Sequence, residues 1–375
     1  MKEWDILKTD EDVINKLSIN LNVSQEISRL LVLRGITNYE DAESFFRPCL
    51  TKAYDPFLMK GMDMAVKRLN LAKSEKQNIL VYGDYDVDGT TSVSMMYMFL
   101  LSQEMNVKYY IPNRYDEGYG ISRKGIDYAF ANNINLIISL DCGIRAIDQI
   151  EYAKQYKIDF IICDHHTPSK EIPEAYSVLN PKQFDCRYPN KDLSGCGVGF
   201  KLITAYAIRN SIDINITYGY LGLLAISIVS DMVPITNENR IYAFHGLRKI
   251  NNNPSVGIKS LISIAKRSDK VDSSDILFGI APLINAAGRI SHAHEAVRVL
   301  IEGCYDKAKV YAKKLHLNNQ ERKDVEKKVF HEASHMIDKQ KMSNVVYGNN
   351  WHKGVVGIVA SKLIEVHYRP TIVFA

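Results

Sequence analysis

The sequence predicts an α/β protein built on a parallel sheet, preceded by a helical segment and followed by a long connecting helix and the start of a second α/β unit. Three observations predict this fold. Apolar runs of strand length alternate with helical patterns from residue 78 to residue 166. A charged helical pattern then spans about 306–341, and two short apolar runs flank a last helical pattern at 355–366. Such alternation is typical of parallel sheets with right-handed crossovers.

These patterns divide the chain into four regions. Residues 1–60 form a helical segment, 61–250 the main α/β domain, 251–340 a helical region with the long connecting helix, and 341–375 the incomplete start of a second α/β domain. The chain stops at Ala375 inside a predicted strand, where a domain rarely ends. A C-terminally truncated chain is therefore expected.

The composition is that of an ordinary globular protein. The chain has 375 residues, of which 46% are hydrophobic and 24% charged, with a net charge of +4. This length is enough for two or three domains, and the mild positive charge permits a nucleic-acid partner without arguing for one. The six cysteines form no CxxC pair, which disfavours a disulfide framework or a zinc ribbon. The sequence contains neither a secretory h-region nor a run of about 18 apolar residues, so a cytoplasmic protein without a membrane span is expected.

The first 75 residues show helical patterns and no candidate chemistry. Apolar residues recur at helical spacing in 13–21, 24–34 and 38–46, and residues 61–75 predict an amphipathic helix in front of the sheet. We expect these helices to provide packing or a partner surface.

An acidic stretch follows the first predicted strand. Residues 79–82 are apolar, as a buried parallel strand requires. Asp84, Asp86 and Asp88 come next, followed by Gly89, and a helical pattern begins at Ser92. Three carboxylates this close repel one another, so a fold that gathers them needs a compensating cation. Hard divalent ions such as Mg²⁺ or Mn²⁺ suit such oxygen ligands. The alternatives are an acidic surface turn and an EF-hand calcium loop, although an EF-hand loop follows a helix and this stretch follows a strand.

Two more predicted strands end in metal-ligating side chains. The run 136–140 is followed by Asp141, and the run 160–163 by an Asp-His-His triplet. The triplet consists of Asp164, His165 and His166. A single Asp after a strand is commonly a turn or a helix cap. Three parallel strands, however, bring their carboxyl ends to one edge, and neutral imidazole can ligate Mn²⁺ beside carboxylates, so the set indicates a metal site.

Three later motifs carry weaker signals. The apolar helical run 221–229 is followed closely by Asp231, which makes Asp231 a candidate further ligand. GCGVGF at 195–200 lacks the GK[ST] of a phosphate loop and is predicted to begin a helix. In NAAGR at 285–289, Arg289 beside a glycine turn suits anion binding.

Taken together, the motifs resemble the DHH phosphoesterase superfamily and, within it, the branch of single-strand-specific 5′→3′ exonucleases. The resemblance covers nearly all of the chain, and the ordered set is far more specific than the DHH triplet alone. The set consists of GDYDVDGTTS (83–92), NRYDEGYG (113–120), SLDCG (139–143), DHH (164–166), SDMVP (230–234), NAAGR (285–289) and GVVGIVASKL (354–363).

The resemblance implies a DHH domain on the parallel sheet, the start of a DHHA1 domain at the C-terminal end, and a site for two divalent ions, Mn²⁺ or Mg²⁺. The metal ligands that it implies are Asp84, Asp86, Asp88, Asp141, His165 and Asp231. Asp141 would bridge the ions and would form the catalytic group with Asp164 and His166, in which His166 faces the scissile phosphate. The residues implied to bind nucleic acid are Arg114, Tyr119 and Arg289. A base could stack on Tyr119.

The function implied is hydrolysis of phosphodiester bonds in single-stranded DNA from the 5′ end by two-metal catalysis, in DNA recombination and repair. A monomer is expected, and a helicase and a single-strand-binding protein are the candidate protein partners. Members of this branch carry a glycine-rich GGHxxAAG-type motif and an OB-fold beyond the point that this sequence reaches.

Two alternatives keep the fold and change the function. In the first, the same site hydrolyses oligoribonucleotides, cyclic dinucleotides or pyrophosphate. In the second, the chain is a non-catalytic scaffold that binds nucleic acid, although every candidate ligand is present in this sequence.

Overall fold

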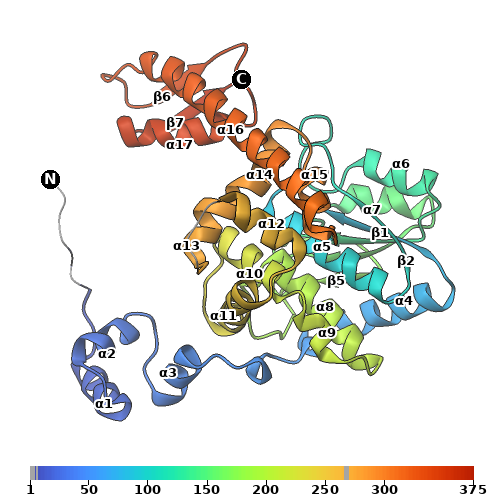
Figure 1. Cartoon of the computed structure of the whole chain (residues 1–375), viewed down its shortest axis with the longest axis horizontal. Coiled ribbons are helices and arrows are strands. Elements are labelled where there is room, and N and C mark those ends of the chain that lie inside the picture. Colours follow the sequence, from blue (N-terminus) through green and yellow to red (C-terminus); the bar gives the residue numbers. More distant parts are fainter. Residues whose placement is uncertain (1–4, 6, 266–269) are drawn as a thin grey trace.

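The computed structural model describes residues 5, 7–265 and 270–375 and confirms the α/β fold class (Figure 1). Its main sheet has five parallel strands in the order β2-β1-β3-β4-β5. In that order the strands are Asn106–Tyr110, Asn78–Gly83, Leu136–Leu140, Asp159–Cys163 and Ser177–Leu179. The sequence predicted the first four. It missed β5, because three residues give too little pattern to be recognised.

The strand order determines where a ligand can bind. From β1 the chain crosses to β2 on one side, then returns past β1 to place β3 on the other side. The carboxyl ends of β1 and β3 are therefore adjacent at the point where the winding reverses. In open α/β sheets, the crevice at this point is the usual ligand site.

Helices cover both faces of the sheet, as the alternation within β1 requires. Leu80 and Tyr82 pack with Ile126 and Ile150, from α6 (Arg123–Ala131) and α7 (Ile147–Lys154). Ile79 and Val81 instead join the larger core on the opposite face. The helices that pack in this larger core against the sheet are α4 (Met62–Ser74), α5 (Val87–Ser102) and α8 (Gly195–Arg209).

The larger core continues into a helical region. Its elements are α9 (Ile214–Tyr218), α10 (Leu221–Ser230), α11 (Asn237–Asn252), α12 (Val256–Ala265), α13 (Ser273–Asp275), η3 (Ile276–Ile280), α14 (Ala281–Ile290) and α15 (His294–Ile301). The glycine turn predicted beside Arg289 is wrong, because Gly288 and Arg289 lie within α14. A Cβ on Gly288 would lie 2.7 Å from the carbonyl oxygen of Tyr85, so glycine serves close packing of α14 on the acidic loop.

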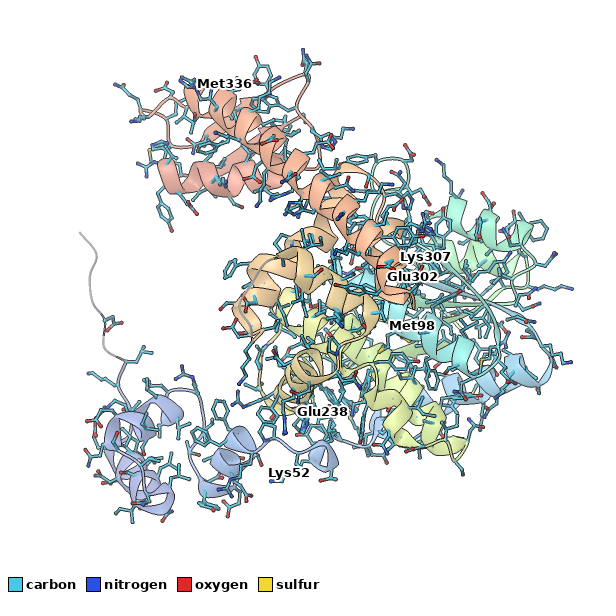
Figure 2. All side chains as sticks on the ribbon, viewed as in Figure 1. Lys52, Met98, Glu238, Glu302, Lys307 and Met336 are labelled. Carbon is cyan, nitrogen blue, oxygen red and sulfur yellow. The ribbon has the colours of Figure 1, made fainter. Side chains whose placement is uncertain are left out.

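A long helix, α16 (Tyr305–His335), leads to a small second unit (Figure 1). Figure 2 shows Lys307, near its start, against the main body and Met336, just after its end, in the small unit. That unit consists of β6 (Asn344–Tyr347), α17 (Val356–Val366) and β7 (Thr371–Phe374), with the two strands parallel. The predicted strand-helix-strand pattern is confirmed, and α16 ends six residues earlier than expected. Within the described residues, no helix combines the length and the apolar character that crossing a membrane requires.

The N-terminal helices form a small cluster of their own, apart from the main body in Figure 1. They are α1 (Glu11–Leu21), α2 (Gln25–Val32) and α3 (Tyr39–Phe46), followed by the short turns η1 (Leu50–Lys52) and η2 (Pro56–Leu58). Leu17, Leu31 and Ala42 make up their buried core. The division of the chain at residues 60, 250 and 340 stays a prediction.

A buried ion pair connects this N-terminal segment to the main body. Lys201 of α8 and Glu238 of α11 are each about 1% exposed and form a hydrogen-bonded ion pair. Lys201 also donates to the carbonyl of Tyr54 at 2.8 Å, and Glu238 accepts from the Tyr54 amide at 2.8 Å and the Tyr188 hydroxyl at 2.6 Å. Figure 2 shows Glu238 on the side of the body that faces the N-terminal segment. Burial lowers the pKa of Lys201, which the charge of Glu238 partly offsets.

We predict that Glu238→Ala lowers the free energy of unfolding by about 3–5 kcal/mol, because it leaves the Lys201 ammonium buried without its counter-charge. Urea unfolding followed by circular dichroism would measure the change. The matched control is Asp185→Ala, which breaks the exposed Lys60–Asp185 pair and should have a far smaller effect. Equal effects of the two substitutions would contradict the role given to Glu238.

Candidate metal centre

Three loops and one helix end bring the predicted ligands to the carboxyl edge of the sheet. Asp84 follows β1, Asp141 follows β3, and His165 comes two residues after β4. Asp231 is the C-cap residue of α10, whose apolar side chains bury that helix in the main core. The structure thus joins residues separated by up to 147 positions into one site, as the sequence predicted.

The acidic loop after β1 is shaped by a helix cap and a glycine. Asp86 is the N-cap of α5, and its Oδ1 accepts the Gly89 amide at 3.0 Å. A Cβ on Gly89 would lie 2.4 Å from the carbonyl oxygen of Asp84, so only glycine allows the helix to start this close to the strand end. Asp84 and Asp88 are held on either side of this turn.

His165 lies at the centre of the carboxylates. Its Nε2 is 3.2 Å from Asp141 Oδ1, 3.6 Å from Asp231 Oδ2 and 3.8 Å from Asp88 Oδ2. Three overlapping groups each have ligand atoms within 4.8 Å of one another. The groups are Asp88 with His165 and Asp231, Asp84 with Asp86 and Asp141, and Asp141 with His165 and His166.

Asp141 belongs to two of these groups and has an unusual backbone. Its φ angle is +60°, in the left-handed region that few residues other than glycine adopt, although Asp is one of the more tolerant types. Its amide donates to the carbonyl of Cys163 at 2.9 Å, which continues the sheet ladder past the end of β3. Backbone strain of this kind concentrates at functional sites, where the surrounding structure holds it.

The donor atoms of the site fit a divalent cation. Asp84 Oδ1, Asp141 Oδ1 and both ring nitrogens of His165 are buried and have no hydrogen-bond partner among the described residues. Buried polar atoms normally find partners, so a set of orphaned carboxylate and imidazole atoms at one point calls for a ligand that accepts their lone pairs. Oxygen donors with one or two imidazoles suit Mn²⁺ and Mg²⁺.

Electrostatics give the same indication. Burial and then the charge of Asp86 raise the pKa of Asp84 to about 7, and burial and then the charge of Asp88 raise the pKa of Asp231 to about 7. For the same two reasons, burial and the charge of Asp88, the pKa of Asp141 lies well above its usual range. Without a cation, these carboxyls hold protons that carboxyls in water have lost at neutral pH.

Asp88 is held in place by the amino end of another helix. Its Oδ2 accepts the Gly195 amide at 2.6 Å, and its Oδ1 accepts the Cys196 amide at 2.9 Å and the Ser227 hydroxyl at 2.7 Å. Ser194 caps this helix, α8, and its Oγ lies 2.6 Å from Ser227 Oγ. The free amides and the dipole of a helix N-terminus favour an anion.

This arrangement explains the GCGVGF motif. The predicted helix start at Gly195 is confirmed, and the anion at its N-terminus is the side chain of Asp88. A Cβ on Gly195 would lie 2.6 Å from the Cβ of Asp141, so glycine lets α8 reach the site. Ser194 and Ser227 were not predicted. A serine one residue before a glycine-rich helix start is a recognisable N-cap, but nothing in the sequence says what that helix end faces.

Asp164 and His166 form a separate hydrogen-bonded chain beside the metal ligands. Asp164 Oδ1 lies 2.7 Å from His166 Nδ1 and accepts the His165 amide at 2.7 Å, and Oδ2 accepts the Ile144 amide at 2.9 Å. These bonds occupy the Asp164 carboxylate, so it orients His166. His166 Nε2 lies 3.1 Å from the Tyr119 hydroxyl.

The pKa values of the pair move apart. The hydrogen bond to Asp164 raises the pKa of His166, against an opposing effect of burial. Burial acts to raise the pKa of Asp164, but the hydrogen bond from His166, its charge and two backbone amides together lower it. Burial also lowers the pKa of His165, which keeps that imidazole neutral as a metal ligand must be.

The residues predicted to bind nucleic acid lie next to the acidic loop. The Arg114 guanidinium is 4.9 Å from the ring centre of Tyr85, and the Tyr119 ring packs edge-on against the same tyrosine at 6.3 Å. Arg289 donates to the Gly354 carbonyl at 3.0 Å, and burial followed by the charge of Arg114 lowers its pKa. The charge of Arg114 acts to lower the pKa of Asp84, so this cation lies near the acidic loop. Nothing in the sequence indicated that Tyr85 would link them.

The fold and the site define an α/β domain with a candidate centre for divalent metal ions at the edge of its sheet. The DHH family, N-terminal domain, matches residues 78–228 of the chain.

Three similar proteins or structures extend the comparison. Over 374 residues the chain is 37% identical to the single-stranded-DNA-specific exonuclease RecJ of Bacillus subtilis (strain 168), covering 99% of this chain and 47% of that protein. The crystal structure of RecJ from Thermus thermophilus in complex with Mn²⁺ matches with a TM-score of 0.85 and 26% identity, over 97% of this chain and 52% of that chain. The Mg²⁺ complex of the same protein matches with a TM-score of 0.77 and 25% identity, over 97% and 50%. The chain spans about half the length of these relatives.

We predict that Ser227→Ala weakens Mn²⁺ binding by about 10-fold, because partners that orient metal ligands typically contribute 10- to 100-fold in affinity. Isothermal titration calorimetry would measure it. Ser260→Ala is the matched control, since Ser260 is also fully buried, and among the described residues its hydroxyl bonds only to the Gly257 carbonyl of its own helix. Unchanged affinity in the Ser227 variant would contradict the role given to this hydroxyl.

A second prediction concerns pH. The unfolded chain titrates its aspartates near pH 3.8, whereas Asp84 and Asp231 titrate near 7 in the metal-free fold. Between about pH 4 and 7 the folded state therefore holds more protons than the unfolded state, and metal-free stability should fall as pH rises through this window. A bound divalent ion displaces these protons, so Mn²⁺ should bind more tightly at pH 8 than at pH 6.

Two measurements check this pH dependence. Calorimetry at pH 6 in buffers of different ionisation enthalpy should show proton release on Mn²⁺ binding. Thermal unfolding at pH 5 and pH 8, each with and without Mn²⁺, should show the larger stabilisation by the ion at pH 8. Affinity that does not change with pH would contradict the raised pKa values.

Proposed function

We propose that this chain carries the catalytic centre of a metal-dependent exonuclease that degrades single-stranded DNA from its 5′ end, with two divalent ions, Mn²⁺ or Mg²⁺. The observation that carries the proposal is the convergence of buried carboxylate and imidazole atoms without partners at one edge of the sheet, within the described part of the chain. The similarity to the RecJ exonucleases, two of whose structures contain Mn²⁺ or Mg²⁺, supports it.

The proposed ligands are the six residues expected from the sequence. They are Asp84, Asp86, Asp88, Asp141, His165 and Asp231. Asp141 is the proposed bridge, because its carboxylate lies in two ligand groups at once. Bound ions of this kind supply Lewis acidity and lower the pKa of a bound water.

The proposed catalytic work of the protein's own groups lies with Asp141, Asp164 and His166. The Asp164 carboxylate accepts a hydrogen bond from the N–H at His166 Nδ1, which leaves Nε2 as the ring atom that faces the substrate. Nε2 is 3.1 Å from the Tyr119 hydroxyl, an oxygen at the distance that a phosphate oxygen would take. In its charged form His166 can donate to a phosphate oxygen there and stabilise the charge that develops on it.

Arg114, Tyr119 and Arg289 are proposed to bind the DNA strand. Arginine guanidinium groups recognise phosphate oxygens with paired donors, and Arg114 and Arg289 would offset the repulsion between the strand and the acidic cluster. The Tyr119 ring is 57% exposed, so it is accessible to a base.

The biological setting of the proposal comes from the sequence expectations. It comprises a role in DNA recombination and repair, a cytoplasmic location and a monomeric state. A helicase and a single-strand-binding protein are the proposed protein partners. The regions 1–60, 61–250, 251–340 and 341–375 are the proposed domain divisions.

We predict that Asp141→Ala lowers the Mn²⁺-dependent hydrolysis of 5′-phosphorylated single-stranded DNA by more than about 100-fold, since even groups that only orient metal ligands contribute up to about that much. Release of labelled mononucleotides would be measured. Asp63→Ala, which removes an exposed carboxylate paired with Arg209, is the control and should leave the rate unchanged.

Substrate comparison tests the alternatives. Faster cleavage of dinucleotides, cyclic dinucleotides or pyrophosphate than of long strands would favour the oligoribonuclease-type alternative. A protein that binds single-stranded DNA but neither binds Mn²⁺ nor cleaves any of these substrates would favour the scaffold.

A further inference from the structure

A cavity of about 230 Å³ lies beside the candidate metal centre. It is bounded on one side by Tyr119, Asp164 and His166, the chain of groups described above. The loop between β3 and α7, from Cys142 to Ala146, bounds it on the other side. The cavity and the catalytic site therefore share a wall.

The floor of the cavity is apolar. Ile121, Cys142 and Ile144 line it and are 5%, 1% and 1% exposed. The loop is held close to the sheet at Gly143, whose φ is +117° and where a Cβ would lie 2.9 Å from Ser139 Oγ. This floor offers apolar contact.

The rim of the cavity is polar. Gln149 on α7 lines it and makes no side-chain hydrogen bond within the described part of the chain. Arg145 is fixed by a bond from Nε to the Thr167 carbonyl at 3.0 Å, so its cation stays at the mouth. An amide with both donor and acceptor atoms beside a fixed cation suits the polar edge of a heterocycle.

We infer that this cavity receives the nucleobase of the nucleotide whose phosphate lies at His166, an inference that rests on the proposed function. His166 and Tyr119 belong to both places, so a base joined to that phosphate through one sugar reaches the cavity. Nucleobases have apolar faces and polar edges, which match the floor and the rim. The volume is below the roughly 300 Å³ of the smallest pockets for drug-sized ligands, so it suits one base better than two.

The inference assigns a role in base binding to two side chains. Gln149 contacts the edge of the base, and Ala146, which lines the cavity with a single methyl group, leaves the space that the base fills. Both act on substrate binding and neither lies in a metal-ligand group.

The test compares three ligands on the Mn²⁺-loaded chain by calorimetry: 5′-dAMP, deoxyribose 5-phosphate and inorganic phosphate. Because stacking or enclosure of one base contributes about 1–3 kcal/mol, dAMP should bind about 10-fold more tightly than deoxyribose 5-phosphate. Ala146→Trp fills the cavity and should abolish this difference while phosphate binding is retained. Gln149→Ala should reduce the difference.

Two matched variants control for added bulk and lost amide. Ala131→Trp places the same ring on the exposed end of α6, and Gln155→Ala removes an exposed amide just after α7, so both should leave the difference intact. In the nuclease assay, Gln149→Ala should raise KM with little change in kcat, since it touches the base and not the reacting phosphate.

Each contrary result has its own meaning. Equal binding of dAMP and deoxyribose 5-phosphate, or a difference that survives in Ala146→Trp, would overturn the inference and leave the proposed function in place. Failure of all three ligands to bind, together with absence of cleavage, would overturn both.

Discussion

The structure depends on one electrostatic constraint, the mutual repulsion of carboxylates gathered away from water. At an effective dielectric constant of about 20, two unit charges 4 Å apart repel by about 4 kcal/mol, and Asp84, Asp86 and Asp141 have oxygens within 4.8 Å of one another. The fold offsets part of this repulsion with the partial positive charge at the N-terminal ends of two helices. Asp86 is bonded to the start of α5 and Asp88 to the start of α8. What remains uncompensated, at Asp84, Asp86, Asp141 and Asp231, is the charge that a cation would neutralise.

The glycines near the site follow from the same constraint. Helix termini can stabilise a carboxylate only through direct contact of their first amides, which requires the helix to approach closer than a side chain permits. Gly89 and Gly195 remove the Cβ at two such close approaches, to the backbone of Asp84 and to the Cβ of Asp141. The glycine-rich motif at 195–200 thus binds an anion, as such motifs often do, but the anion belongs to the protein. A loop that resembles an incomplete phosphate-binding sequence therefore holds a candidate metal ligand, Asp88.

The sequence predicted the parts of the site that lie at strand ends. Apolar strands can be recognised in a sequence, and parallel strands place their carboxyl ends at the same edge of the sheet. Asp84, Asp141 and His165 meet for that reason, and Asp231 could be proposed because it ends an apolar helix. Contacts between different helices and strands could not be predicted from the sequence. Ser227 sits mid-helix in an apolar run, and only the packing of α10 against α5 and α8 turns its hydroxyl toward Asp88. Arg289 was placed in a turn because glycine commonly marks one, whereas Gly288 is there to let a helix touch Tyr85.

Tyr119 shows how the two halves of the site can work together. Its hydroxyl lies 3.1 Å from His166 Nε2, and its ring lines the cavity beside the β3–α7 loop. A phosphate oxygen that reaches His166 must take the place of that hydroxyl, and a base that enters the cavity must pack beside that ring. Both events involve the Tyr119 side chain. Because this residue is more than half exposed, it can move with little loss of buried surface area. Under the proposed function, the base and the phosphate of one nucleotide would therefore both contact Tyr119.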